Sequence, residues 1–412
     1  MAIIAPFKAI RPVRDKVHLI ATRPYYSYKK NVLKAKLEDN PYTFLRIINP
    51  EFNNDVQTKP NSDERFQLVK KKYKEFIDAG ILIQDESPRL YIYRQINNGK
   101  AFTGVVAGAS IEEYQNDLIK KHEATITSRE GMFTRYLDIV GYNAEPVLLS
   151  YKDDHHHIEK LLSQLTSVRS EYEFTTTDRI THELWVLSEN DTLLLKNAFE
   201  DINATYIADG HHRSASSARL FSERFNSGNT TSGNIGYFLA FFVEESRLNI
   251  LEFNRLVKTL NGYSADTFLN YLKALGKVSE ISHANKPQEE HHIHFYVKNQ
   301  WYEFVINSYL IDNKHPVKSL DSDLLTELVL KPLLGIDDLK TSDQIEFIPG
   351  NESIQSMEDK INSGKFEVGF VLYPATIEQV KRVADNQLNM PPKSTWVEPK
   401  LRSGLTIYNI NE

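Results

Sequence analysis

Five chemically versatile residues stand in a row in the stretch ATYIADGHHRSASSARLF, residues 204–221. They lie between an apolar run and a run of small residues that begins with Ser214, and they are Asp209, Gly210, His211, His212 and Arg213. Arginine can donate two parallel hydrogen bonds to phosphate oxygens, and histidine can donate a further one. Glycine lets a bulky anion approach the backbone closely. These residue types indicate an anion site, with phosphate as the expected ligand.

The surrounding pattern places this run between a strand and a helix. Residues 204–209 are typical of a strand, and residues 214–225 are typical of a helix. Backbone N–H groups at a helix N-terminus lack intrahelical partners and carry partial positive charge, so they bind anions. Ser214 would add a hydroxyl in the first turn. Asp209 needs another task, such as accepting a proton, holding Mg²⁺ or fixing a histidine tautomer.

The same run also has a purely structural interpretation. An Asp-Gly turn that caps a helix, with exposed histidines beside it, needs no ligand. The concentration of an acid, two histidines and an arginine within five positions favours the ligand site, although a motif depends on its structural context.

Two further segments carry candidate residues. In KHEAT, His122 and Glu123 are expected to form an acid/base pair beside the Asp209 turn, and the structural alternative is a surface helix end followed by a loop. In MPPKST, residues 390–395, Lys393 would reach a phosphate as a point charge. The alternative there is a proline turn that packs the tail.

Composition narrows the class of protein. The chain has 412 residues, enough for two or three domains, and its 41% hydrophobic and 25% charged residues are ordinary for a globular protein. It contains no cysteine, which excludes disulfides, zinc sites with thiolate ligands and a cysteine nucleophile. A net charge of −6 does not indicate a nucleic-acid partner.

Membrane and targeting signals are weak. The first residues lack the long apolar core of a signal peptide. The most apolar stretch, residues 235–243, is about half the length that spans a bilayer. We therefore expect a cytoplasmic protein with no membrane partner.

The order of elements favours an α+β fold. Residues 89–96 and 100–110 form an expected hairpin, and helix–strand crossovers alternate with such hairpins along the chain. This mixture predicts mixed sheets with flanking helices. The pattern restarts at about Ala265, and we expect an N-terminal region over 1–260 with the ADGHHR motif and a C-terminal region over 261–412 that ends in the MPPKST tail.

Many blocks of the sequence resemble domain-of-unknown-function family 1015. They include FKAIRP, YIADGHHRSASSA, KKHEATITSRE, LDSDLLTELVLKPLLGI and MPPKSTWVEPKLRSGL. The resemblance covers nearly the whole chain, but the family name implies no activity. Tyr26 and Thr134 stand where acids are expected in this family, which makes a binding role or a divergent substrate more plausible.

The run DGHHR alone is similar to the phosphate-binding motif of the ParB/sulfiredoxin superfamily, which includes a nucleotide-dependent serine kinase. This resemblance implies a nucleotide-binding core for an ATP- or ADP-like ligand. It also implies that His211, His212 and Arg213 meet the phosphates. Sulfiredoxin chemistry is excluded because it needs a cysteine at the position of His211, and the chain has none.

Three functions follow as hypotheses. The first is a phosphotransferase for a small hydroxyl substrate, in which Arg213, a histidine and Lys393 neutralise charge, Asp209 or Glu123 is the base, and Mg²⁺ takes part. The second is a binding protein that senses a nucleotide or other anion without turnover. The third is a metal-dependent hydrolase built on Asp209, His211 and His212, although neighbouring ligands on a tight turn suit a tetrahedral ion poorly. The oligomeric state stays open.

Overall fold

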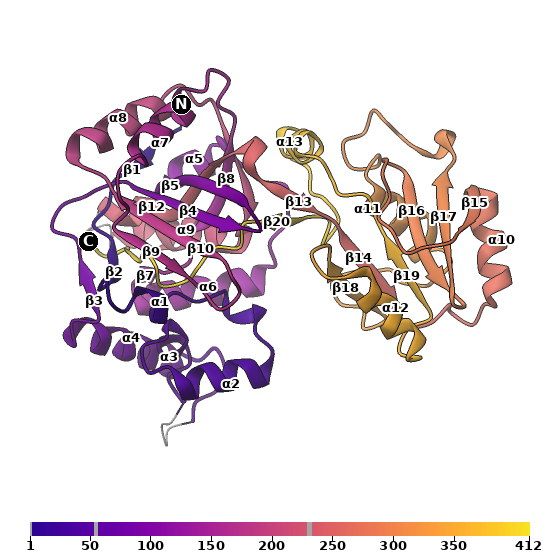
Figure 1. Cartoon of the computed structure of the whole chain (residues 1–412), viewed down its shortest axis with the longest axis horizontal. Helices are drawn as coiled ribbons and strands as arrows, with labels where there is room; N and C mark the ends of the chain where they lie inside the picture. The colour runs from indigo at the N-terminus through magenta and orange to yellow at the C-terminus, as the bar shows by residue number, and fades with distance from the viewer. Residues whose placement is uncertain (1, 53–56, 229–232) are drawn as a thin grey trace. The chain divides into compact units, whose positions relative to one another are not determined.

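A computed structural model describes residues 2–52, 57–228 and 233–412, except for the side chain of Tyr26 (Figure 1). The chain divides into two compact units. Unit 1 comprises Met1–Lys121, Thr125–Leu248 and Pro399–Glu412, and unit 2 comprises His122–Ala124 and Asn249–Glu398.

This division differs from the predicted regions 1–260 and 261–412 in three places, the first of which is His122–Ala124, a part of unit 2. Strand β14 (Phe253–Val257) belongs to unit 2 because it pairs with β18 (Ile345–Pro349) and β19 (Val368–Val371). The last residues belong to unit 1, where β21 (Tyr408–Asn409) pairs with β7 (Tyr142–Asn143). The chain therefore leaves unit 1, builds unit 2 and returns.

Unit 1 is built on a mixed sheet of nine strands within the described residues. In spatial order they are β6 (Ile119–Lys120), β11 (Thr205–Asp209), β8 (Val147–Tyr151), β12 (Tyr237–Glu244), β5 (Lys100–Ser110), β4 (Tyr91–Asn97), β10 (Thr181–Val186) and β9 (Tyr172–Thr175), with β1 (Ile4–Ala5) paired to β5. The pairs β11–β6 and β12–β8 are parallel and the other pairs are antiparallel. Strand β8 and the middle of β12 are buried throughout, which explains their unbroken apolar runs.

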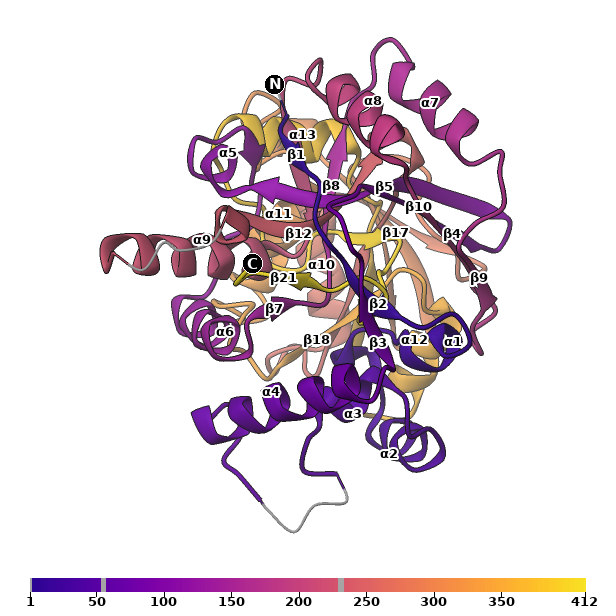
Figure 2. The same cartoon turned by 90° about the vertical axis from the view of Figure 1, so that its left-hand side faces the viewer.

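Helices flank this sheet. They are α1 (Val17–Ile20), α2 (Lys30–Asp39), α3 (Phe44–Ile48), α4 (Asp63–Asp78), α5 (Ile111–Gln115), α6 (Thr127–Val140), α7 (His157–Leu165), α8 (Glu189–Phe199) and α9 (His211–Asn226), with 3₁₀ turns at Tyr25–Ser27, Gly233–Gly236 and Glu245–Arg247. A two-stranded ribbon joins β2 (Ile10–Pro12) to β3 (Leu82–Gln84). Helix α6 packs against α9 (Figure 2) and places the buried Thr134 hydroxyl near the carbonyl of Ser216. The position where an acid was expected thus lies in a helix–helix contact.

Unit 2 contains a separate antiparallel sheet. Its order is β15 (Gly276–Ile281), β17 (Gln300–Ile306), β16 (His292–Val297), β19, β14 and β18, and β13 (Asn249–Leu251) pairs with β20 (Trp396–Glu398). The helices are α10 (Ala265–Leu275), α11 (Asp321–Leu325), a π-helix at Thr326–Leu330, α12 (Ile354–Asn362) and α13 (Ile377–Asp385), with a 3₁₀ turn at Ser308–Leu310.

The prediction of an α+β protein with mixed sheets and flanking helices is confirmed. The helix expected over 214–225 begins earlier, at His211, so the two histidines and Arg213 form its first turn. In the described parts of the chain, no helix is both long and apolar enough to cross a membrane.

Candidate functional site

The predicted motif lies where β11 meets α9. Strand β11 ends at Asp209, and Gly210 adopts the left-handed conformation with φ of 106° before the 16-residue helix begins. A residue with a side chain is strained there. A Cβ atom on Gly210 would also lie 3.0 Å from two nitrogens of the Arg213 guanidinium. Glycine thus lets the chain turn directly from the sheet into the helix.

Two cations hold the carboxylate of Asp209. Arg213 Nη2 lies 2.6 Å from Oδ2, and Lys400 Nζ lies 3.0 Å from Oδ1. Burial opposes ionisation, but the charges of Lys400 and Arg213 outweigh it and lower the pKa of Asp209 to about 2. A carboxylate with so low a pKa is a weak base. This argues against Asp209 as the proton acceptor in a transfer reaction.

Arg213 is bound on several sides. Besides Asp209, its Nη1 atom lies 2.8 Å from Glu145 Oε1 and donates to the carbonyl of Pro146 at 2.5 Å. The Ser403 hydroxyl donates to the other oxygen of Glu145 at 3.1 Å. The residue predicted to hold phosphate is therefore engaged by two carboxylates, and a phosphate would have to compete with them for the guanidinium. We call Glu145, Asp209, Gly210, Arg213 and Lys400 the junction.

The rest of the first turn is less accessible than the sequence suggested. His211 is buried and Ser214 is fully buried, with its hydroxyl donating to the carbonyl of His211 at 3.0 Å. His212 is half-buried. This differs from the expectation that Ser214 offers a hydroxyl to a ligand. The reason is that α9 starts at His211, which turns Ser214 onto the face that packs inside the protein.

His122, Glu123 and Lys393 belong to unit 2 rather than to the unit that holds the junction. His122 is buried, which lowers its pKa to about 4, so its ring is neutral near pH 7. Its carbonyl accepts a hydrogen bond from Met390 at 2.8 Å. Glu123 and Lys393 are exposed. Their participation at the junction stays a prediction.

Metal binding at the junction finds no support from the ligand set. Across residues 2–52, 57–228 and 233–412, no group of three or more His, Cys, Asp or Glu side chains gathers where it could hold a metal ion. The hydrolase hypothesis, which needs Asp209, His211 and His212 as ligands, lacks that convergence. The lysine and arginine on Asp209 occupy the oxygens that a cation would use.

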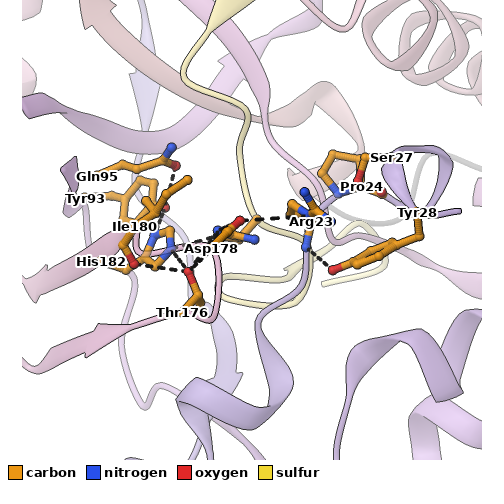
Figure 3. Close-up of polar contacts among 11 residues, drawn as sticks. Arg23, Pro24, Ser27, Tyr28, Tyr93, Gln95, Thr176, Asp178, Ile180 and His182 are labelled. Carbon is orange, nitrogen blue, oxygen red and sulfur yellow. Dashed lines mark hydrogen bonds and ion pairs between the residues drawn. The ribbon is translucent and has the colours of Figure 1, made fainter. Parts of the chain in front are cut away.

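Sequence reasoning missed Lys400, which the chain's return to unit 1 brings to Asp209. It also missed a second polar cluster of unit 1, in which Arg402 of the same returning segment contacts β10 and the turn after β9. Figure 3 shows His182 of this cluster with Tyr93 and Gln95 of β4. The members of this His182 cluster are Tyr93, Gln95, Thr176, Asp178, His182 and Arg402. Arg23 Nε lies 3.9 Å from Asp178 at its edge.

The contacts define the protonation of His182. Arg402 Nε donates to His182 Nε2 at 3.2 Å, so that nitrogen is an acceptor. Nδ1 then carries the proton and donates to the Tyr93 hydroxyl at 2.7 Å, which donates to Gln95 at 3.2 Å. Burial and then the charge of Arg402 lower the pKa of His182 to about 3, against the opposing effect of Asp178. The imidazole is neutral at physiological pH.

The carboxylate of Asp178 neutralises Arg402. Its two oxygens accept from Arg402 Nη2 at 2.9 and 2.8 Å, and Thr176 donates to the same carboxylate at 2.5 Å. Arg402 is only 4% exposed. This cluster therefore anchors the returning segment two residues beyond Lys400. The block PKLRSGL contains Arg402, but it does not indicate which distant residues Arg402 contacts.

The fold and the junction define an α+β protein with a glycine turn and a charged network at the start of a helix. The chain belongs to a family described as "Protein of unknown function (DUF1015)", whose profile matches residues 4–323. No curated protein matches the chain.

Solved structures with similar chains include three with low sequence identity. SbnI with a C-terminal truncation, from Staphylococcus aureus, is 11% identical, with 74% of this chain and 87% of that chain covered and a TM-score of 0.40. A free serine kinase in complex with AMP is 14% identical, with coverages of 74% and 91% and a TM-score of 0.35. A conserved hypothetical protein from Pyrococcus furiosus is 14% identical, with coverages of 76% and 96% and a TM-score of 0.34. The ParB/sulfiredoxin-like core stays a prediction.

Proposed function

We propose that the chain binds a nucleotide or another phosphate-bearing ligand at the junction. The observation that carries this proposal is the arrangement around Gly210. Gly210, in the left-handed conformation, immediately precedes a 16-residue helix. Arg213 and Lys400 form ion pairs with Asp209, the residue before this glycine. A helix N-terminus favours anions, and a glycine lets them approach the backbone.

The carboxylates at the junction set the affinity in this proposal. Asp209 and Glu145 already neutralise the cations, so an arriving phosphate exchanges partners with them. The side chains of Asp209, Arg213 and Lys400 are 30%, 24% and 23% exposed, which leaves them within reach of solvent and ligand. Exchange between partly exposed charges costs less than exposing a buried pair.

Phosphoryl transfer to a small hydroxyl substrate is the finer proposal. It requires a base from outside the junction, because Asp209 holds its proton so weakly. Glu123 and His122 stay the predicted candidates. The alternative, a nucleotide-sensing protein without turnover, uses the same binding contacts and differs only in forming no product.

Titration calorimetry with ATP, ADP, AMP and inorganic phosphate, each with and without Mg²⁺, tests the binding step. K400M removes one cation and should weaken binding about tenfold. D209N removes the competing carboxylate, so it should strengthen phosphate binding. K72M changes a lysine on the exposed face of α4 and serves as the matched control, with binding unchanged. No binding of any ligand up to the millimolar range would contradict the proposal.

Product formation separates the two versions of this function. If bound ATP yields ADP in the presence of a small alcohol, the phosphotransferase version holds. If every nucleotide that binds is recovered intact, the sensing version holds.

A further inference from the structure

Unit 2 contains a charged residue in an apolar setting. Arg255 lies in the middle of β14, where its neighbours across the sheet are Phe347 on β18 and Phe370 on β19. Its side chain is fully buried, and the guanidinium carbon lies 5.7 Å from the centre of the Phe347 ring. Arginine is almost never fully buried unless it is paired.

The partners of Arg255 are too few for a buried guanidinium. Nη1 donates to the carbonyl of Phe253, and Nη2 donates to the carbonyl of Lys393 over a long 3.3 Å. Among the described residues, no acceptor lies within hydrogen-bonding distance of Nε and no carboxylate forms an ion pair with the side chain. A guanidinium has five donors, and leaving a buried one unmatched is costly.

The charge on Arg255 persists at neutral pH. Burial lowers the pKa of Arg255 only to about 9, while the charge of Asp321 opposes that decrease. Asp321 is itself bound by the ring and the backbone N–H of His291, at 2.9 Å each, and does not contact the guanidinium. The positive charge is therefore buried without a contacting anion of the protein.

The MPPKST motif contacts Arg255 through the carbonyl of Lys393. Lys393 has φ of 58°, a left-handed conformation that is strained for a residue with a side chain. Its ammonium lies 5.2 Å from the centre of the Phe253 ring and its side chain is exposed. Ser394 is buried next to it, with its hydroxyl oxygen 2.9 Å from that of Ser322 on α11. The Ser394 hydroxyl also donates to the carbonyl of Pro391 at 2.7 Å, so it is bonded within the motif. The cation of Lys393 thus lies over a ring of the strand that carries Arg255.

We propose that Arg255 and Lys393 form an anion site of unit 2 that takes the phosphate group of a small ligand. Guanidinium and ammonium donors together match the oxygens of phosphate. In the described conformation the carbonyl of Lys393 occupies Nη2. Binding moves this segment away from β14, so that the anion replaces the long hydrogen bond and meets Nε. This site consists of residues of unit 2, and the proposal does not depend on the proposed function at the junction.

Calorimetry with inorganic phosphate on the full chain tests this site. K400M weakens the junction about tenfold and leaves unit 2 unchanged, so the phosphate binding that a second substitution in unit 2 removes from the K400M background is that of unit 2. K393A in the K400M background removes an exposed side chain and should fold normally, and it should weaken this binding about tenfold. R255M in the same background should abolish it. Binding by both double variants that equals that of K400M would overturn the proposal.

Hydrogen exchange supplies an independent measurement. In K400M, phosphate should change the exchange of the backbone amides of residues 393–395 and of β14. R255M should show no such change. The alternative, in which Arg255 only fastens the motif to the sheet, expects the same exchange in K400M with and without phosphate, and that result would overturn the proposal even if the variants fold poorly.

Discussion

The junction and the His182 cluster of unit 1 each receive a cation from the returning segment, Lys400 and Arg402, but they bury these cations differently. Lys400 at the junction keeps a side chain 23% exposed, whereas that of Arg402 in the His182 cluster is only 3% exposed. The junction pairs two cations with two carboxylates that solvent can reach. The His182 cluster surrounds one cation with a carboxylate, a hydroxyl and a neutral imidazole inside the protein.

This difference separates exchangeable contacts from anchoring contacts. Partly exposed charges trade partners with a ligand at small cost, whereas a buried guanidinium without its partner is strongly destabilising. We infer that the His182 cluster anchors the returning segment and that the junction uses the lysine which this anchor positions. Of these two regions of unit 1, the junction is then the one suited to ligand binding.

The largest effect is expected from removing the anchor. R402M leaves Asp178 without its main partner and His182 without its donor, and it should lower the free energy of unfolding by about 3 kcal/mol. Urea denaturation of the full chain measures this. K72M, which breaks an exposed pair with Glu75, should cost less than about 0.5 kcal/mol. A loss for R402M no larger than that of K72M would break the distinction between the two regions.

The pH dependence of stability sharpens the comparison. The folded pKa of His182 is about 3, below the ordinary 6.5, so the unfolded chain binds the extra proton between these values. Stability from this group is present above pH 6.5 and is lost as pH falls toward 3, by about 1.4 kcal/mol per pH unit. Buried His122, with a folded pKa of about 4, adds a slope of the same sign in this window. H182Q should therefore remove about half of the histidine slope between pH 6.5 and 4, measured by denaturation at several pH values.

The choice of pH range and a control variant separate the contribution of His182 to this pH dependence from that of other groups. The lowered pKa of Asp209 acts in a lower window, between the ordinary 3.8 and about 2, where its stabilising ionised form is lost as pH falls. Measurements above pH 4 therefore exclude most of its effect. H155Q changes an exposed histidine and should keep the wild-type slope. Equal slopes for H182Q and H155Q would show that the buried imidazole does not titrate as its surroundings imply.

How far the sequence predicts each region depends on how its residues are brought together. Asp209, Gly210 and Arg213 are neighbours in the chain, so strand and helix patterns alone place them at one turn. Lys400 and Arg402 reach unit 1 only because the chain returns after building unit 2. No periodicity encodes that return. The inward direction of Ser214 was missed for a smaller reason, the start of α9 three residues earlier than expected.

The general fold followed from patterns that act over short distances. The apolar run of β12 and the hairpin of β4 and β5 can be predicted from residues that are close together in the sequence. Domain limits are harder, because they depend on which distant strands pair. Strand β14 continues the sequence after β13 without a break in composition, yet it pairs with strands about ninety or more positions later.

The smallest effect concerns the backbone of the junction. G210A places a side chain at φ of 106° and next to the Arg213 guanidinium, and it should lower the free energy of unfolding by about 1 kcal/mol. G131A is the matched control in α6, where helical geometry favours alanine by about 1 kcal/mol, although its Cβ would lie 3.3 Å from an Arg219 nitrogen. Opposite signs for the two variants in urea denaturation would support a glycine required by the turn. If G210A loses phosphate binding while its free energy of unfolding matches that of the wild type, Gly210 is required for ligand binding rather than for the fold. The glycine would then contribute to binding at the junction in addition to the ion pairs.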